Sequence, residues 1–165
     1  MKTGIFYGTT AGTTAKVANR IANAMHVASS DVYNIAKTEP SKVGEYDFLI
    51  FGSPTYGSGE LQDDWYDFLD GIAVMDLRGK RVAIFGLGDE NMRSTFCNAA
   101  GIIYKRIKDT GAEIVGHYNT FPYQFESSEA VPVEGAGSIG LLIDEVNHPE
   151  ATDERIAQWT QAIAR

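Results

Sequence analysis

Short apolar runs alternate with helical patterns along this chain, and this alternation restricts the fold more than any other feature of the sequence. The runs cover residues 4–7, 32–35, 48–51, 82–85 and 114–115. All of them except the two-residue run at 114–115 have the length of a strand that is buried on both faces. Strands that alternate with helices predict an α/β fold, in which a five-stranded parallel sheet carries helices on both of its faces.

Four segments place apolar residues on one side of a helix. The first begins near Thr13, the second begins near Asp63, and the third ends at Gly111. The fourth has Thr152 or Asp153 as its expected N-terminal cap, because short polar side chains accept hydrogen bonds from the first free amides. The apolar positions that define these faces are Val17, Ile21, Ala24 and Met25; Trp65, Phe68 and Leu69; Ala99, Ile103 and Ile107; and Ile156, Trp159 and Ile163.

Residues 117–138 interrupt the alternation, because they show no clear period, and an apolar run at 139–143 follows them. A loop of this length without regular structure is unusual inside one domain. We interpret it either as a surface excursion that splits the last strand or as a functional loop. No linker or repeat divides the chain, so residues 1–165 are expected to form a single domain. The aromatic residues of the excursion form either a partner surface or a packing cluster of their own: Tyr118, Phe121, Tyr123 and Phe125.

The charge balance and the cysteine count argue against several classes of protein. The 22 acidic and 14 basic residues give a net charge of −8, which disfavours nucleic acid as a partner. The one cysteine, Cys97, leaves no internal disulfide and fits a reducing cytoplasm, and it is expected to be a small buried hydrophobe rather than a redox centre. No apolar run approaches the roughly 20 residues of a membrane span and no leader is recognised, so we expect a cytoplasmic protein without membrane insertion.

In an open parallel sheet, ligands bind outside the carboxyl ends of the strands, so loops 8–14, 53–62 and 86–96 form the candidate site. The first loop contains two glycines, four threonines and no charged residue. It leads into a helix, whose free amides and dipole attract an anion. The loop therefore predicts a phosphate held without a counter-cation. The alternative is a plain turn in which Thr13 only caps the helix.

Other phosphate motifs do not fit the chain. A P-loop requires a lysine before its Ser/Thr, whereas Thr13 follows a glycine directly. The dinucleotide fingerprint has only a weak match at 86–88, with Asn91 at the place of its third glycine. Ser53 stands where a phosphoacceptor domain would carry an aspartate.

The second and third loops suit a planar ligand. Tyr56 lies at a strand end, where its ring is either a flat wall for such a ligand or an ordinary half-buried aromatic. Gly57 and Gly59 let the backbone around Ser58 change conformation at little cost, although they also suit a tight turn. In the third loop, Asp89 is either a ligand contact or a solvated turn residue.

These three loops, in this order and spacing, resemble those of flavodoxin. The matching segments are FYGTTAGTT, GSPTYGSGELQDDW, FGLGD, FCNAAG and TDERIAQW, and the match covers nearly the whole chain. Residues 117–138 resemble the insertion of long-chain flavodoxins. The resemblance implies a three-layer fold with the strand order 2-1-3-4-5, an order for which flavodoxin is itself the standard example.

The resemblance also implies noncovalent FMN, with its phosphate in residues 9–14 and its ring between the second and third loops, stacked on Tyr56. Two positions depart from the family pattern. Ala11 replaces a threonine, and the third loop lacks the usual tyrosine, so that either Met92 or Arg93 covers that face of the ring or the face is more exposed. The residues implied for cofactor binding are Thr9, Thr10, Ala11, Gly12, Thr13, Thr14, Pro54, Thr55, Tyr56, Gly57, Ser58, Gly59, Leu87, Gly88, Asp89, Met92, Arg93, Phe96 and Cys97.

Two features of the second loop bear on the chemistry of such a cofactor. The Gly57–Ser58 peptide is expected to turn its carbonyl toward flavin N5 on reduction, because glycine tolerates positive φ. The acidic residues Glu60, Asp63 and Asp64 are expected to disfavour negative charge on the ring. They are also expected to attract basic partners, the alternative being that acidic charge serves only solubility.

The function implied by the resemblance is that of a low-potential one-electron carrier, in which the cofactor does the chemistry and no residue is catalytic. The alternatives are an FMN-dependent NAD(P)H quinone or azo-compound reductase on the same fold, and a non-redox binding module. The family's partners are redox proteins such as ferredoxin/flavodoxin–NADP reductase, and in various organisms photosystem I, nitrogenase or radical-activating enzymes. A monomer is expected, and no metal site, because the three histidines are scattered.

Overall fold

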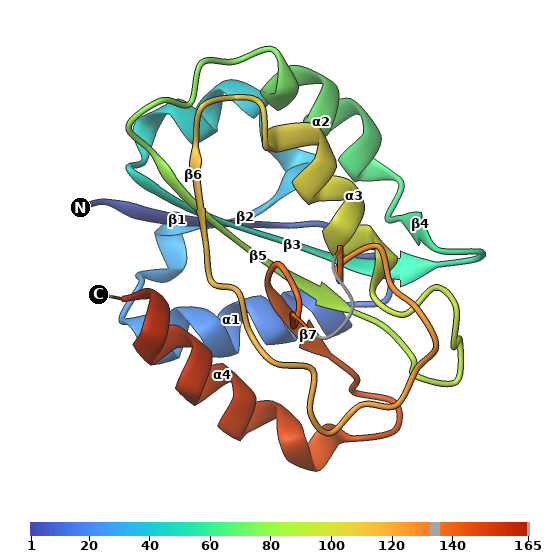
Figure 1. Cartoon of the computed structure of the whole chain (residues 1–165). Coiled ribbons are helices and arrows are strands. Elements are labelled where there is room, and N and C mark those ends of the chain that lie inside the picture. The colour runs from blue at the N-terminus through green and yellow to red at the C-terminus, as the bar shows by residue number, and fades with distance from the viewer. Residues whose placement is uncertain (133–135, 165) are drawn as a thin grey trace.

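A parallel sheet forms the middle layer of the fold, with its strands in the order β2-β1-β3-β5-β6 (Figure 1). The computed structural model describes residues 1–132 and 136–164. Without the two-residue β4, the order along the chain is the predicted 2-1-3-4-5, and every pairing on this path is parallel. The five strands are β1 (Thr3–Tyr7), β2 (Val32–Asn34), β3 (Phe48–Tyr56), β5 (Arg81–Leu87) and β6 (Glu113–Val115).

The last strand of the sheet is split in two. β6 pairs with residues 81–83 of β5, and β7 (Leu141–Ile143) pairs with residues 85–87 of the same strand, also in parallel. Both pieces therefore lie along one edge of β5, with residues 117–138 between them in the chain. The prediction that this excursion splits the last strand is confirmed.

β3 continues to Tyr56, well beyond the apolar run at 48–51, because its end forms a hairpin with β4 (Glu60–Leu61). Tyr56 pairs with Glu60 in this short antiparallel ladder. The sequence analysis did not predict β4. The hairpin carries the second candidate loop outward from the edge of the sheet (Figure 1).

Helices cover both faces of the sheet (Figure 1). The helices α1 (Thr13–Met25) and α4 (Pro149–Ile163) pack on one face, and α2 (Asp64–Ala73) and α3 (Asn98–Ile107) pack on the other. Short 3₁₀ helices precede and follow β2, namely η1 (Ser29–Asp31), η2 (Ile35–Lys37) and η3 (Pro40–Glu45). The predicted three-layer α/β architecture is therefore confirmed.

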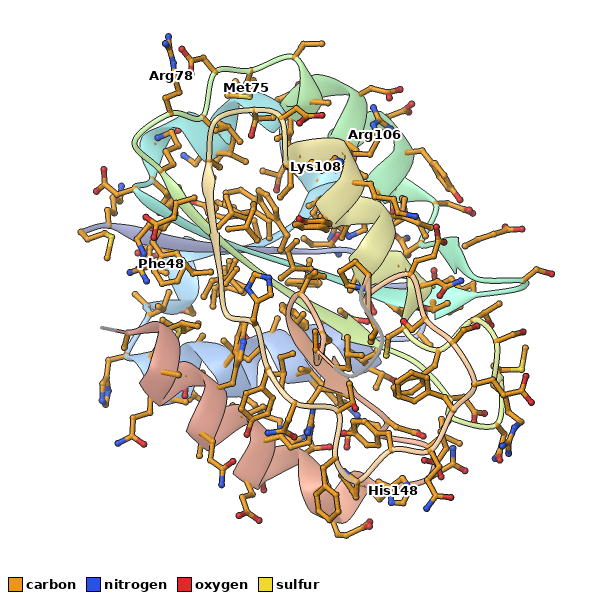
Figure 2. The ribbon with its side chains drawn as sticks, viewed as in Figure 1. Phe48, Met75, Arg78, Arg106, Lys108 and His148 are labelled. Carbon is orange, nitrogen blue, oxygen red and sulfur yellow. The ribbon has the colours of Figure 1, made fainter. Side chains whose placement is uncertain are left out.

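The predicted apolar helix faces are buried with two exceptions, since Ala24 is exposed and Met25 only half-buried. Trp65 and Trp159 are fully buried, one on each side of the sheet, as expected of core residues. Figure 2 shows side chains filling the space on both sides of the sheet, while Arg78 extends outward. None of the described helices combines the length and the apolar character that a membrane crossing requires.

The start of α4 differs from the prediction. The helix begins at Pro149, so the prediction that Thr152 or Asp153 caps it is wrong. Proline suits the first turn, because an N–H at that position would have no helical partner. Thr152 is instead fully buried inside the helix, and its hydroxyl donates to Glu145 at 2.7 Å.

Candidate functional site

The three candidate loops converge at the carboxyl edge of the sheet and enclose a cleft of about 190 Å³. They converge because β1, β3 and β5 are neighbours in the sheet and run in the same direction. Among the lining residues, only Glu145 and Val146 were not predicted from the sequence. The cleft is lined by Thr9, Ala11, Thr13, Thr14, Pro54, Thr55, Tyr56, Leu87, Gly88, Asp89, Glu145 and Val146.

The first loop turns sharply into α1 and leaves backbone amides free. Gly12 occupies the N-cap position with a φ of 95°, a conformation that a β-carbon would strain, and its N–H donates to Thr9 Oγ1 at 2.9 Å. The carbonyl of Gly12 accepts the first helical bond, from Lys16 N at 3.2 Å. The amides between these two residues therefore have no helical acceptor. No acidic side chain in the first turn neutralises this end of the helix.

Thr14 adds a hydroxyl that lacks a partner. The residue is 1% exposed, and its Oγ1 is the only buried side-chain N or O atom without a hydrogen-bond partner among the described residues. A buried polar group left unpaired costs about 1–3 kcal/mol. A phosphate oxygen in the cleft would accept this hydroxyl and the free amides together. The alternative, in which Thr13 only caps the helix, is wrong, because Gly12 is the cap and no side chain caps the amides.

The second loop forms the tip and one wall of the cleft. Gly57 and Gly59 have φ values of 53° and 95°, and Gly59 N donates to Tyr56 O at 3.1 Å, so the β3–β4 connection is a tight turn. A β-carbon on Gly59 would lie 2.6 Å from Asn98 Nδ2, which explains why glycine is required there. The Tyr56 ring is 38% exposed and borders the cleft, an orientation that suits stacking on a planar ligand.

The third loop is held rigidly against the cleft. A β-carbon on Gly88 would lie 2.7 Å from Cys97 N, so glycine permits a close approach of the backbone. The carboxylate of Asp89 accepts hydrogen bonds at one oxygen from Asn91 N at 2.8 Å and from Asn147 Nδ2 at 2.7 Å. Asp89 is therefore a turn residue whose carboxylate is fixed by its neighbours at the cleft wall.

A fourth loop, residues 144–148, completes the cleft. It follows β7, so it lies at the same edge of the sheet as the other three, and it contributes Glu145 and Val146. Glu145 is fixed by Arg20 Nη1 at 2.7 Å and by the Thr152 hydroxyl. The sequence analysis predicted that residues 117–138 split the last strand, but it did not include the loop after the run at 139–143 in the candidate site. The signal was present in the apolar run at 139–143, which is followed directly by polar residues.

Several predicted residues lie outside the lining of the cleft. Met92 is 51% exposed, and Arg93 Nε lies 3.3 Å from Glu126 Oε1 on the insertion. Phe96 and Cys97 are fully buried, so their side chains support the third loop from below instead of facing the cleft. Burial raises the pKa of the Cys97 thiol far above its usual range, which leaves it neutral and supports its interpretation as a small hydrophobe. The other predicted residues outside the lining are Thr10, Gly12, Gly57, Ser58 and Gly59.

Comparison with known proteins identifies the family of this chain. A family model described as flavodoxin matches residues 5–159. The chain belongs to the flavodoxin family. Its relatives include Flavodoxin 1 of Escherichia coli K12, which is 40% identical over 163 residues that make up 98% of this chain and 92% of that protein. The flavodoxin of Haemophilus influenzae is 40% identical over 161 residues, 97% of this chain and 92% of that protein.

Solved flavodoxin structures share the fold. The crystal structure of Fusobacterium nucleatum flavodoxin bound to flavin mononucleotide gives a TM-score of 0.89 at 30% identity and covers 99% of this chain and 97% of that chain. The flavodoxin of Streptococcus pneumoniae TIGR4 gives a TM-score of 0.71 at 26% identity and covers 98% of this chain and 97% of that one. The similarity therefore extends through all four loops of the cleft.

The electrostatics of the cleft are those of a neutral to acidic site. Its charged lining residues are Asp89 and Glu145, and no Lys or Arg lines it among the described residues. Arg20, the cation next to Glu145, also contacts Asp153 at 2.5 Å, so its charge is shared between two carboxylates. No group of metal-binding side chains occurs in residues 1–132 and 136–164.

The aromatic residues of the insertion divide into two kinds. Tyr123 is 7% exposed and lies 5.3 Å from the Phe96 ring, and Phe125 lies 4.8 Å from the same ring. These two residues form a packing cluster under the third loop, and burial raises the pKa of Tyr123 to about 12. Phe121, in contrast, is 81% exposed. The packing interpretation is therefore confirmed for Tyr123 and Phe125, whereas a partner surface around the exposed Phe121 stays a prediction.

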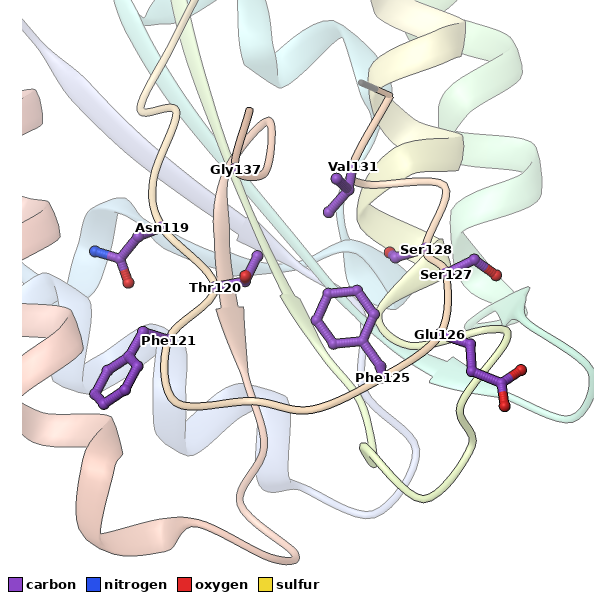
Figure 3. A pocket seen from close by; sticks show the side chains of 9 residues that line it. All are labelled: Asn119, Thr120, Phe121, Phe125, Glu126, Ser127, Ser128, Val131 and Gly137. Carbon is purple, nitrogen blue, oxygen red and sulfur yellow. The ribbon is translucent and has the colours of Figure 1, made fainter. Parts of the chain in front are cut away.

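A second, wider cavity of about 610 Å³ lies on the insertion, with Phe125 and Val131 among the side chains around it (Figure 3). Its other lining residues include hydroxyls and one carboxylate, that of Glu126, but no helix N-terminus. Gly137 and Val131 flank residues 133–135, which lie outside the described chain. This cavity has none of the features that suit the first loop to a phosphate.

Proposed function

We propose that this flavodoxin binds one FMN noncovalently in the four-loop cleft and carries single electrons between redox proteins. The observation that carries the proposal is the first loop, where the unpartnered Thr14 hydroxyl and the free amides of α1 meet without a cation. A helix N-terminus with these groups fits a phosphate monoester. The FMN named for the Fusobacterium nucleatum flavodoxin, at 30% identity, supports the same cofactor here.

Residues of the first loop hold the phosphate in this proposal. Thr13 and Thr14 offer hydroxyls together with their amides, and Gly12 permits the turn that points these groups into the cleft. Ala11 offers no hydroxyl, so the amides carry more of the binding than in relatives with threonine.

The second, third and fourth loops hold the ring. Tyr56 would offer its ring for stacking, and Leu87, Gly88 and Val146, which also line the cleft, would contact the ring system. The Gly57–Ser58 peptide lies at the exposed tip of the hairpin, where its carbonyl is free to turn toward the ring. Bound FMN supplies reversible uptake of one or two electrons, which the side chains of the protein do not provide.

The charges around the cleft tune the carrier toward low potential. Asp89 and Glu145 line the cleft, and Glu60 and Asp63 are exposed beside the second loop. Negative charge added to the ring would meet carboxylates, and the cation beside the cleft, Arg20, is already paired with Glu145 and Asp153, so the final reduction is disfavoured. Solvent screening limits the effect of the exposed carboxylates.

The partners are redox proteins. A ferredoxin/flavodoxin–NADP reductase with a basic docking face suits the net charge of −8, and photosystem I, nitrogenase or a radical-activating enzyme are the other candidate partners. The protein acts as a monomer in the cytoplasm and has no catalytic residue of its own.

An absorbance spectrum followed by anaerobic reductive titration tests the proposal. Purified protein reconstituted with FMN should retain the flavin spectrum after gel filtration and accept electrons in separable one-electron steps. Protein that stays colourless after reconstitution would contradict the proposal. Rapid bleaching by NADPH without an added reductase would instead favour the quinone or azo-compound reductase.

A further inference from the structure

A network of hydrogen bonds joins the third loop of the cleft to the fourth. Asn147 Nδ2 donates to Asp89 Oδ1 at 2.7 Å and to Asp144 Oδ2 at 2.8 Å. Asp144 is fully buried, and the same oxygen accepts the N–H of Glu90 at 2.9 Å. These hydrogen bonds join the third and fourth loops of the cleft directly.

Glu90 and His148 close the outer side of this network. His148 Nε2 lies 2.8 Å from Glu90 Oε1, and the other carboxylate oxygen accepts the N–H of Gln124 at 2.9 Å. The two side chains are 25% and 18% exposed, so water screens the pair less than it screens a surface ion pair. One carboxylate thus ties the third loop to the start of α4, where His148 lies (Figure 2), and to the insertion.

Other groups also face the imidazole. Glu150 Oε1 lies 3.3 Å from His148 Nδ1 but is 71% exposed, and the Tyr123 ring lies 5.7 Å from the imidazole. The Arg155 guanidinium lies on the Tyr123 ring at 4.7 Å. The hydrogen bond to Glu90 is the largest cause that raises the pKa of His148 above its ordinary value, and burial opposes it.

The backbone supports the same arrangement. His148 N donates to the carbonyl of Asp144 at 3.1 Å, and Gly88 N donates to the carbonyl of Ile143 at 3.0 Å. Asp144 presents its own carboxylate to Asn147 and to the Glu90 amide, as described above. The imidazole therefore has the Glu90 carboxylate as its nearest charged neighbour.

We propose that Glu90 and His148 are positioning residues for the cofactor, and that their ion pair holds the third loop against the fourth. This inference rests on the proposed function, because FMN is taken as the ligand of the cleft. The folded-state pKa of His148 is raised, so the contribution of the pair is complete below the ordinary value of about 6.5. It is lost as the pH rises through the raised pKa.

The first test follows the histidine rings by NMR in the ligand-free protein. His148 should titrate above its ordinary range, and E90Q should shift its pKa downward. His26 and His117 serve as internal controls, because neither contacts Glu90 in a described hydrogen bond or ion pair, so E90Q should leave their ring resonances in place. A His148 pKa that E90Q leaves unchanged would overturn the proposal whether or not FMN binds.

The second test measures FMN dissociation constants for the wild type, E90Q and H148Q by fluorescence titration at pH 6 and pH 9. Each variant should bind about threefold to fivefold more weakly than the wild type at pH 6, the size expected of one partly shielded pair, with a smaller ratio at pH 9. Titration of the FMN phosphate is common to all three proteins and cancels in the ratio.

The matched control is E129Q, which also removes one negative charge. The Glu129 carboxylate lies on the insertion, and its Oε1 is 2.6 Å from Lys105 Nζ. Its FMN affinity should equal that of the wild type at both pH values. A ratio for E90Q and H148Q that does not depend on pH would overturn the proposal. If the wild type binds no FMN, the proposed function is overturned, and so is the role of Glu90 and His148 in positioning the cofactor. The NMR titration would still decide whether Glu90 and His148 form an ion pair.

Discussion

The Trp65 indole donates a hydrogen bond from Nε1 to the Gly52 carbonyl at 2.9 Å, and the same carbonyl accepts the N–H of Gly8 at 3.0 Å. One oxygen atom thus joins α2, β3 and the start of the first loop. Trp65 is fully buried under that loop, and a β-carbon on Gly8 would lie 2.7 Å from its ring. The turn that presents the free amides therefore depends on this packing.

Replacement of Gly8 by alanine should disturb this contact. The added β-carbon would also lie 2.4 Å from Gln62 Oε1, so several groups must move. We expect the free energy of unfolding to fall by about 1–3 kcal/mol and the FMN affinity to fall with it. Urea unfolding and fluorescence titration measure the two effects. The control is Gly44→Ala, where the atom nearest to the added β-carbon is Met75 Cε at 4.0 Å. Its free energy of unfolding and its FMN affinity should equal those of the wild type within error. Equal effects of the two substitutions would show that the close packing around Gly8 is not what makes glycine necessary there.

Thr14→Val tests the role of the unpartnered hydroxyl. Removal of a buried polar group without a partner should leave the stability of the ligand-free protein unchanged or slightly higher. FMN binding should weaken about tenfold, because a phosphate oxygen loses its donor. Riboflavin, which has no phosphate, should bind both proteins equally. Thr14→Ser retains the hydroxyl and should restore FMN affinity; equal losses for both flavins would rule out a phosphate contact.

The sequence predicted the first three loops because their position follows from simple rules. Apolar runs mark the strands, and the carboxyl ends of neighbouring parallel strands must meet at one edge. Tyr56, Thr9, Thr13 and Thr14 therefore line the cleft as expected, whereas Thr10 does not. The same rule also holds for the fourth loop, but it was not applied there, although the split of the last strand was predicted: the pairing of β7 with β5 places the carboxyl end of that strand at β7 and brings residues 144–148 to the same edge.

Other features depended on contacts between distant residues. Cys97 adopts a φ of 51°, which no rule for a non-glycine residue predicts, and this conformation turns the chain into α3 with Phe96 and Cys97 in the core. Arg93 was expected near the ligand, but its partner Glu126 lies on the insertion, whose course the sequence did not indicate. Side-chain direction in the third loop was therefore beyond the reach of the sequence pattern.

Tyr56 should contribute to FMN affinity through its ring and not through its hydroxyl. Tyr56→Phe keeps the flat apolar face and should bind FMN within about twofold of the wild type, whereas Tyr56→Ala should bind roughly tenfold more weakly. Fluorescence titration gives the affinities, and the emission of the bound flavin gives a second measure, because removal of a stacked ring should increase it. If the two variants bind equally, the ring does not stack on the flavin.

Arg155 should stabilise the insertion. Its buried guanidinium donates to the carbonyls of Leu142 at 3.1 Å and Asn119 at 2.9 Å and to that of Phe121. Arg155→Met leaves the buried Leu142 carbonyl and the two partly buried carbonyls without this donor, so we expect the free energy of unfolding to fall by about 2–4 kcal/mol. Chemical unfolding measures the loss, and limited proteolysis should cut first near the exposed Phe121.

The control for this prediction is Arg106→Met. Arg106 contacts Asp70 at 2.7 Å, but both side chains are largely exposed, so the loss should stay below about 1 kcal/mol. If Arg155→Met and Arg106→Met lower the free energy of unfolding by similar amounts, the burial of Arg155 does not account for its contribution to stability.

Carboxylates next to the cleft should govern the rate of electron transfer to a basic redox protein. α2 begins beside the first loop, where Gln62 Nε2 donates to Thr9 O at 3.5 Å, and Asp63 and Asp67 are exposed there. Asp63→Asn with Asp67→Asn should slow transfer about twofold to fivefold at low ionic strength, and the difference should vanish at high salt, where charges are screened. Stopped-flow kinetics at several salt concentrations measure the rate of electron transfer.

The control for this prediction is Asp76→Asn. It removes one charge at the opposite end of the sheet, from a carboxylate paired with Arg78, and it should leave the rate of electron transfer unchanged. If it slows transfer as much as the double variant does, net charge and not its position near the cleft determines association.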